Sequence, residues 1–196
     1  MATRETASPG AIPLGLHVVA GPFDLAIPAG WHTRQGLANP SGNFALVYLG
    51  PDALPSACRQ LASGSGVCGP WPLFQLGPDG IVVAVRLHGM PGSQPPPGGD
   101  PVTIAGLPGR RIIGAPDQAC IGIGGSQSID VVLPSVPETS GWMSIDACVA
   151  GGGMAAADEA FDAILASATI APEPSPSESE LKPLQMEVAS LSTGLS

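Results

Sequence analysis

Four cysteines are the side chains whose type and spacing most clearly indicate chemistry in this chain. Pairing of sequence neighbours gives two local disulfides, Cys58–Cys68 and Cys120–Cys148. The first would remove roughly 3 kcal/mol of unfolded-state entropy, and the second, with its longer loop, somewhat more. The pattern predicts an oxidising, extracytoplasmic compartment. Four buried, reduced thiols of a cytosolic protein are the alternative, because free cysteine is among the most buried residue types.

Metal and phosphate sites are not indicated by the remaining residues. His17, His32 and His88 are scattered rather than set at the spacing of metal ligands, and the sequence contains no CxxC pair. The turn-like stretch Gly122–Ser128 (GIGGSQS) lacks the lysine of a P-loop and the third glycine of a dinucleotide site. We therefore expect no metal and no cofactor.

Acid-base and nucleophilic catalysis are also weakly indicated. The G-x-S-x-G elbow of serine hydrolases is absent from the sequence. A hydrolase remains the alternative function if its nucleophile and base meet only in the fold, with Ser126 or Ser128 paired to His32 or His88. The carboxylates that could do acid-base work are each interpreted as turn or exposed strand residues: Asp117, Asp130 and Asp146.

Three tryptophans and one histidine are the candidate binding surface. Trp31, His32, Trp71 and Trp142 could form an aromatic patch for a polymer or a partner protein. The alternative is that the tryptophans close the rim of a small core.

Composition limits the partners that this chain could bind. The formal net charge is −9, with a pI near 4.5 and seven Lys and Arg in all. Binding to nucleic acid or to an anionic membrane needs clustered basic residues, so neither is expected. No apolar run is long enough to span a bilayer. We expect the partner to be a protein or a cell-envelope ligand.

The chain divides into three parts by composition. Residues 1–16 are polar and rich in turn formers, and they predict a flexible segment. Residues 17–171 predict a single α+β domain, and residues 172–196 a Pro/Ser/Glu linker and tail. The amino terminus lacks the features of a secretory signal. We therefore expect the leader or membrane anchor to lie outside the given sequence.

About six strands are predicted from alternating or β-branched runs that end at turn residues. Pro and Gly in 91–101 favour an exposed loop, and 135–141 favours a hairpin connection. The predicted strands are Phe23–Ile27, Phe44–Leu49, Ile81–Leu87, Pro108–Ile113, Ile129–Leu133 and Trp142–Val149.

A helix over Ala155–Ser167 follows these strands, with apolar residues at the helical period. We expect it to pack on one face of an antiparallel sheet. In the last predicted strand, Cys148 alternates onto the other face, and Cys120 is assigned to a glycine-rich strand. A bridge on the face away from the helix is therefore expected.

Several short motifs together resemble the PsbP-like superfamily. FDLAIPAGW (Phe23–Trp31) resembles the opening motif of that superfamily, and DEAFDAILASATI (Asp158–Ile170) resembles its closing helix. The resemblance covers residues 17–171. It implies an antiparallel sheet with helices on its faces, and it implies small lipoproteins or membrane-tethered modules that bind or scaffold. No site residue is carried over from the superfamily.

The expected function is a non-catalytic, extracytoplasmic binding or sensory module of a secreted or membrane-anchored bacterial protein. The tail could add a partner contact, because its apolar residues step by three and four positions. A short amphipathic helix there would bury Leu184, Val188 and Leu191 against a partner or the domain. The alternative is a tail that is disordered or not native to the protein.

Overall fold

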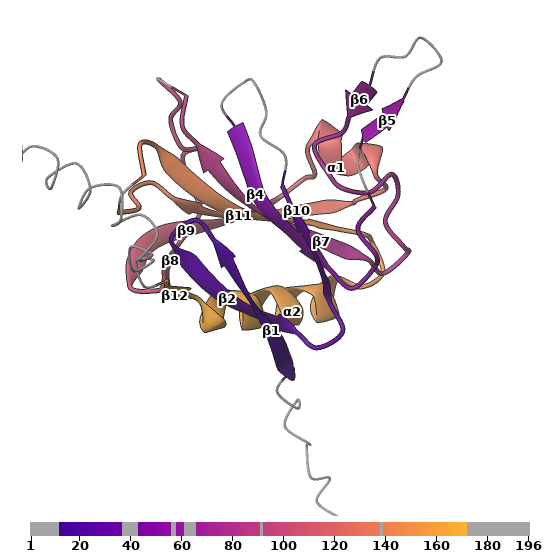
Figure 1. Ribbon diagram of the computed structural model, residues 1–196, viewed down its shortest axis with the longest axis horizontal. Helices are drawn as coiled ribbons and strands as arrows, with labels where there is room; N and C mark the ends of the chain where they lie inside the picture. Colours follow the sequence, from indigo (N-terminus) through magenta and orange to yellow (C-terminus); the bar gives the residue numbers. More distant parts are fainter. Residues whose placement is uncertain are drawn as a thin grey trace, which may run out of the picture.

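A seven-stranded antiparallel sheet is the centre of the fold (Figure 1). The computed structural model describes residues 12–36, 43–55, 58–60, 66–90, 92–137 and 139–171. Across the sheet the strand order is β3 (His32–Gln35), β4 (Asn43–Gly50), β7 (Ile81–His88), β11 (Trp142–Val149), β10 (Gln127–Leu133), β9 (Leu107–Gly114) and β8 (Asp100–Ile104). All of these neighbours pair antiparallel.

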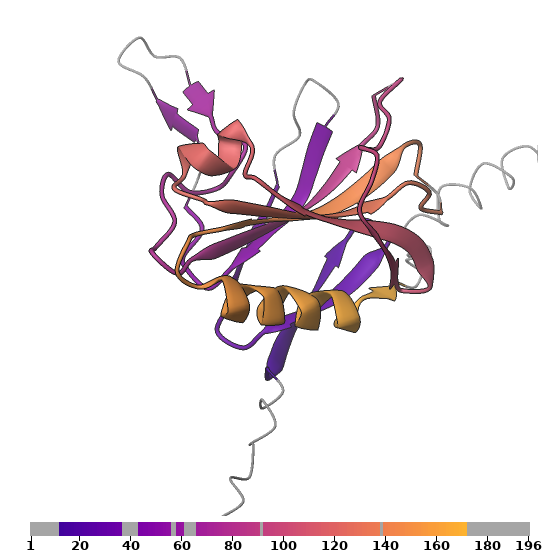
Figure 2. The same ribbon diagram turned by 180° about the vertical axis from the view of Figure 1, so that it is seen from behind.

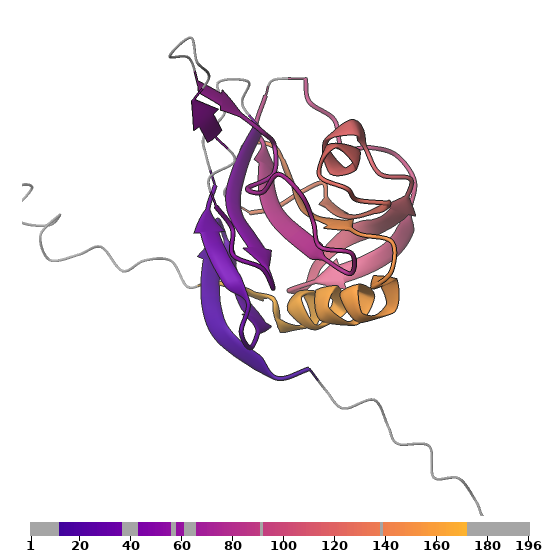
Figure 3. The same ribbon diagram turned by 90° about the vertical axis from the view of Figure 1, so that its right-hand side faces the viewer.

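One face of the large sheet is covered by the long helix and a second sheet (Figures 2 and 3). Helix α2 spans Met154–Ser167, and the second sheet has the order β1 (Leu14–Ala20), β2 (Phe23–Pro28), β12 (Thr169–Ile170). The short helix α1 (Gln118–Gly122) lies on the opposite face. A separate two-stranded ribbon is made of β5 (Cys58–Gln60) and β6 (Gly66–Cys68). The α+β class with an antiparallel sheet and a C-terminal helix is thus confirmed.

Alternation along the central strands separates two hydrophobic clusters. On β11, the side chains of Met143 and Ile145 are fully buried in the larger cluster together with Phe161 of α2. Cys148 belongs to the smaller cluster on the opposite face, together with Trp71. The predicted period-two pattern of this strand is therefore confirmed, and it leaves the second face available for polar side chains.

Helix α2 is held to the sheets by its apolar side and by polar contacts at both ends. Ala157, Phe161 and Ile164 are buried, as the helical period predicts. Arg111 of β9 forms ion pairs with Asp158 and Asp162. At the other end, the Ser167 hydroxyl accepts a hydrogen bond from the backbone N–H of Ala26 in β2 at 2.9 Å.

The N-terminal boundary differs from the prediction, because β1 begins at Leu14 rather than after residue 16. This strand pairs with β2 through the two-residue turn Gly21–Pro22, and Gly21 has a φ of 60°. Much of β1 is exposed, so its sequence carries little of the apolar alternation that marks a half-buried strand. The edge strands β3 and β8 were missed for the same reason.

Cys120 lies in helix α1, so its assignment to a glycine-rich strand is wrong. The Asp117 carboxylate accepts a hydrogen bond from the Cys120 backbone N–H at 2.7 Å, which is the N-cap contact of this helix. Gly124, with a φ of 87°, ends the helical turn and returns the chain to β10. The expected tail contact through Leu184, Val188 and Leu191 lies outside the described residues. Neither described helix has the length and hydropathy needed to cross a membrane.

Candidate functional site

The Cys120–Cys148 disulfide fixes α1 on the face of the large sheet that points away from α2. Its two Cα atoms are 5.5 Å apart, and both residues are at most 1% exposed. Gly125 lies so close that a Cβ at this position would overlap both sulfur atoms. This predicted pairing is confirmed, on the predicted face, although one partner lies in a helix.

The second predicted pair, Cys58 and Cys68, occupies the ribbon β5–β6. The two residues are directly opposite each other in the antiparallel register. Directly opposite residues have Cβ atoms about 4.5–5.5 Å apart, close to the separation that a disulfide needs. Because the side chains of both cysteines lie outside the described part of the structure, this bridge stays a prediction.

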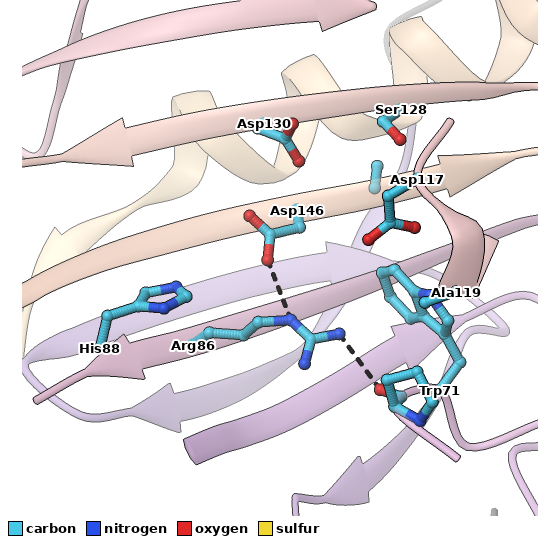
Figure 4. Close-up of a pocket in the computed structure, with 10 residues that line it drawn as sticks. Trp71, Arg86, His88, Asp117, Ala119, Ser128, Asp130 and Asp146 are labelled. Atoms are coloured by element: carbon cyan, nitrogen blue, oxygen red, sulfur yellow. Dashed lines mark hydrogen bonds and ion pairs between the residues drawn. The ribbon is translucent and has the colours of Figure 1, made fainter. Parts of the chain in front are cut away.

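A cavity of about 230 Å³ opens between α1, the segment around Trp71 and the face of the sheet (Figure 4). Its polar lining comes from three strands and from the N-cap of α1. The lining residues are Pro70, Trp71, Arg86, His88, Asp117, Ala119, Ser128, Asp130, Asp146 and Ala147.

Two carboxyl groups face each other on the floor of this cavity. Asp130 of β10 is the direct register partner of Asp146 of β11. Burial, followed by the negative charges of Asp146 and Asp117, raises the pKa of Asp130 to about 7 against the lowering effect of the Arg86 charge. Burial also raises the pKa of Asp146, against the lowering effect of the Arg86 charge. The pair therefore carries less than two negative charges at neutral pH.

Arg86 is the cation that neutralises Asp146. Its Nε donates to Asp146 Oδ2 at 2.9 Å, and the two side chains are only 18% and 16% exposed. A second guanidinium nitrogen donates to the carbonyl of Pro70 at 3.2 Å. The guanidinium also lies over the Trp71 ring, 4.8 Å from its centroid, in cation–π geometry. These contacts hold Arg86 in one orientation at the edge of the cavity.

His88 is a neutral group at physiological pH. Burial and, to a smaller extent, the Arg86 charge lower the pKa of His88 to about 4. The imidazole stacks on Trp142, with ring centroids 3.6 Å apart, and its Nε2 is hydrogen bonded to Ser144 Oγ at 2.8 Å. Trp142 Nε1 in turn donates to Ser93 Oγ at 3.0 Å. His88 is thus part of a packed structural network.

The predicted aromatic surface is divided between the two faces of the fold. Trp31 packs against the larger cluster on the α2 side, and His32 is exposed on the edge strand β3. Trp71 is only 5% exposed within the smaller cluster, and Trp142 is partly covered by His88. The four residues do not form one patch, and Trp71 alone among them lines the cavity.

The alternative Ser/His pairing brings only two of its four residues to the cavity, Ser128 and His88. Ser128 is level with Cys148 and Val82 in the sheet, six residues along β7 from His88. At about 3.3 Å per residue this places them roughly 20 Å apart along the strands. The Ser126 hydroxyl donates to the Val149 carbonyl instead. The geometry gives no nucleophile–base contact between these residues.

Two polar groups of the cavity have no hydrogen-bond partner within the described part of the chain. The indole Nε1 of Trp71 is buried and unpartnered. Asp130 has no ion pair or hydrogen bond with any described group, whereas its neighbour Asp146 has both. Figure 4 shows Trp71 pointing toward Asp117, across the cavity from Asp130. A donor and an acceptor are thus left for a ligand.

Interpreting Asp130 and Asp146 as exposed strand residues was wrong, and Arg86 was missed. Each of the three is flanked by apolar residues in its strand, which is the signal that could have identified them. A charged residue in a strand buried on both faces needs a partner, so such residues predict an ionic cluster. Among the described residues, no three His, Cys, Asp or Glu side chains are arranged to hold a metal ion.

Comparisons with protein families, with curated proteins and with solved structures found no match for this chain.

Proposed function

We propose that this protein is a non-catalytic, extracytoplasmic binding or sensory module of a bacterial cell, and that the cavity beside α1 is its ligand site. The observation that carries the proposal is the pair of unpartnered polar groups, Asp130 and Trp71 Nε1, in one cavity. An unsatisfied buried polar group costs about 1–3 kcal/mol of folding stability. Such a cost is understandable where a ligand completes the missing contacts.

The surroundings of the cavity favour binding over catalysis. The histidine that lines it is neutral, stacked on Trp142 and hydrogen bonded to Ser144, and both of these contacts restrict its movement. Arg86 is held by Asp146 and Pro70. A rigid lining of this kind orients a ligand without supplying a nucleophile.

The size of the cavity supports a small ligand or one end of a larger one. A volume of about 230 Å³ is slightly below the usual range of about 300–1,000 Å³ for pockets that bind drug-sized molecules. We infer that the bound group has on the order of ten non-hydrogen atoms.

An extracytoplasmic location is part of the proposal and is supported by the disulfide Cys120–Cys148. The same bridge holds the N-cap residue Asp117 at the cavity, so oxidation contributes to the shape of the site. We propose a second bridge between Cys58 and Cys68, which are register partners in the β5–β6 ribbon.

A substitution that fills the cavity tests this function. Ser128→Phe places a large side chain at the lining, and Ser135→Phe adds the same side chain at an exposed connection as the matched control. Thermal unfolding is measured with millimolar amines, amino acids, sugars and organic acids. We expect one class to raise the Tm of the wild type and of Ser135→Phe but not of Ser128→Phe. The proposal is wrong if no class raises the Tm, or if Ser128→Phe responds like the control.

A further inference from the structure

The charges that line the cavity do not balance. Asp146 is paired with Arg86 at 2.9 Å, and these two charges cancel. His88 carries no charge at neutral pH, because burial and the Arg86 charge lower its pKa to about 4. Asp117 and Asp130 remain, without a cationic partner among the described residues. The lining is therefore net negative, and it belongs to a chain of formal net charge −9.

The two unbalanced carboxylates have free acceptor capacity. Asp117 Oδ1 accepts from the Cys120 backbone N–H at 2.7 Å, and the other carboxylate oxygen has no partner in the described part of the chain. Asp130 accepts no hydrogen bond there at all. An ionised carboxylate makes its strongest hydrogen bonds with a charged donor. The missing partner is therefore a cation with N–H groups.

Trp71 gives an independent indication of a ligand and of a second feature in it. The side chain is 95% buried, since Trp71 is 5% exposed, and its Nε1 has no acceptor within the described residues. An indole N–H is a donor only, so neither a bare metal ion nor an ammonium group can satisfy it. The ligand must bring an acceptor, such as a hydroxyl or carbonyl oxygen.

We propose that the cavity binds a small ligand that carries a protonated primary amine next to a hydrogen-bond acceptor. The ammonium lies between Asp117 and Asp130, and the acceptor takes the hydrogen bond from Trp71 Nε1. This inference rests on the proposed function of the cavity and names its ligand class.

Protons compete with the amine for Asp130. The titratable and charged groups facing this carboxyl are Asp146, Asp117, Arg86 and His88. Together with burial, the two aspartates raise the pKa of Asp130 to about 7, against the opposing effect of Arg86. Binding of an ammonium ion therefore releases part of a proton near neutral pH.

Calorimetry with matched probes tests the ligand class. Ethanolamine has the amine and the acceptor, ethylamine has only the amine, and ethylene glycol has only the acceptor. We expect ethanolamine to bind about fivefold more tightly than ethylamine. This ratio of affinities corresponds to the net free energy of one neutral hydrogen bond. Ethylene glycol and acetate should not bind. In two buffers of different ionisation enthalpy, the heats at pH 7 should reveal proton release on ethanolamine binding.

Variants assign the binding to the named side chains. Asp130→Asn should weaken ethanolamine binding at least about tenfold and remove the proton release. Trp71→Phe should remove the preference of ethanolamine over ethylamine. Asp100→Asn is the charge-matched control, because Asp100 is opposite Arg111 in the register and lies on the α2 face. It should leave the affinity within about twofold.

The inference is overturned if ethylene glycol, acetate or calcium chloride binds and ethanolamine does not, or if Asp130→Asn and Asp100→Asn behave alike. Absence of proton release from the wild type also overturns it, and that measurement does not require any variant to fold. A neutral or anionic compound that stabilises the wild type but not Ser128→Phe would support the proposed function of the cavity. The same result would contradict only the inference that the ligand is an amine. If no probe of any class binds, both fail.

Discussion

Asp130 and Asp146 are direct partners across the β10–β11 pair, on the face of the sheet turned away from α2, and of the two only Asp146 has a cationic partner among the described residues. Cross-strand partners have Cβ atoms about 4.5–5.5 Å apart, and like charges at this separation destabilise the pair. The fold retains this unfavourable arrangement beside an otherwise apolar cluster.

Asp130→Asn should stabilise the ligand-free protein more at pH 8 than at pH 5. The pKa of Asp130 is about 7 in the folded state, above its ordinary value of 3.8. Between pH 3.8 and pH 7 the folded state therefore binds more protons than the unfolded state. As a result, Asp130 decreases the free energy of unfolding as the pH rises toward 7. We expect a gain on the order of 2 kcal/mol at pH 8. Urea unfolding at both pH values measures it, and an equal or negative change at pH 8 would contradict the account.

Arg86→Met should destabilise the fold by about 3 kcal/mol, because it leaves Asp146 as a nearly buried charge without its partner. Loss of Arg86 destabilises the ionised form of Asp146 and not the protonated form. The decrease in the free energy of unfolding should therefore be greater at pH 8 than at pH 5. The double variant Arg86→Met/Asp146→Asn should recover most of the stability. Arg110→Met is the control, because Arg110 makes an exposed contact with the Pro96 carbonyl. If both arginine variants lose the same small amount, the ion pair does not stabilise the site.

His88 should remain neutral in the folded state down to a pH well below 6. Burial and the Arg86 charge lower the pKa of His88 to about 4 from 6.5. The contribution of His88 to the free energy of unfolding is fully present above pH 6.5. It decreases as the pH falls toward 4, because the imidazole takes up a proton in the unfolded state before it does so in the folded state. An NMR titration of the imidazole carbon signals checks the value. A midpoint near 6.5 would show that the stacked and hydrogen-bonded arrangement with Trp142 and Ser144 does not persist in solution.

The cysteines should form two linked pairs and leave no free thiol. Non-reducing peptide mapping should recover Cys120 with Cys148 and Cys58 with Cys68. Reduction of the first pair should cost roughly 3–4 kcal/mol on the loop-closure model. Four alkylatable cysteines in the native protein would contradict both the pairing and the proposed compartment.

Gly125→Ala should destabilise the disulfide region although it adds only one carbon. Its Cβ would overlap Cys120 Sγ and Cys148 Sγ, neither of which is a flexible chain end. We expect a loss of about 1–3 kcal/mol in urea unfolding. Gly114→Ala is the matched control, because an added Cβ at Gly114 meets no atom within 4 Å. Equal effects of the two substitutions would contradict the close approach seen here.

The strands and the long helix of this fold could be predicted because burial imposes local periodicity. Met143, Ile145 and Phe161 occur at the spacings that a half-buried strand and an amphipathic helix require. The Cys120–Cys148 pairing followed from the spacing of the cysteines, and alternation in β11 placed Cys148 on the correct face. By contrast, α1 depends on one capping contact from Asp117. Such a short element has too few residues to show a period.

The cavity could not be predicted because it depends on the order of strands in space. Arg86, Asp130 and Asp146 meet because β11 lies between β7 and β10. The distant β7 pairs with β11 through long-range contacts, which no local pattern in either segment specifies. A charged residue within each apolar strand was visible in the sequence, but its partner was not. The resemblance to the PsbP-like superfamily stays a prediction.

The most direct test of the site is a carbon-13 NMR titration of the Asp130 side-chain carboxyl, with and without saturating ethanolamine. The account predicts a midpoint near pH 7 in the free protein, as burial and the neighbouring aspartates require. It predicts a decrease of at least about one pH unit when an ammonium group occupies the cavity. A midpoint near 4 in the free protein, or an unchanged midpoint in the presence of the amine, would contradict it.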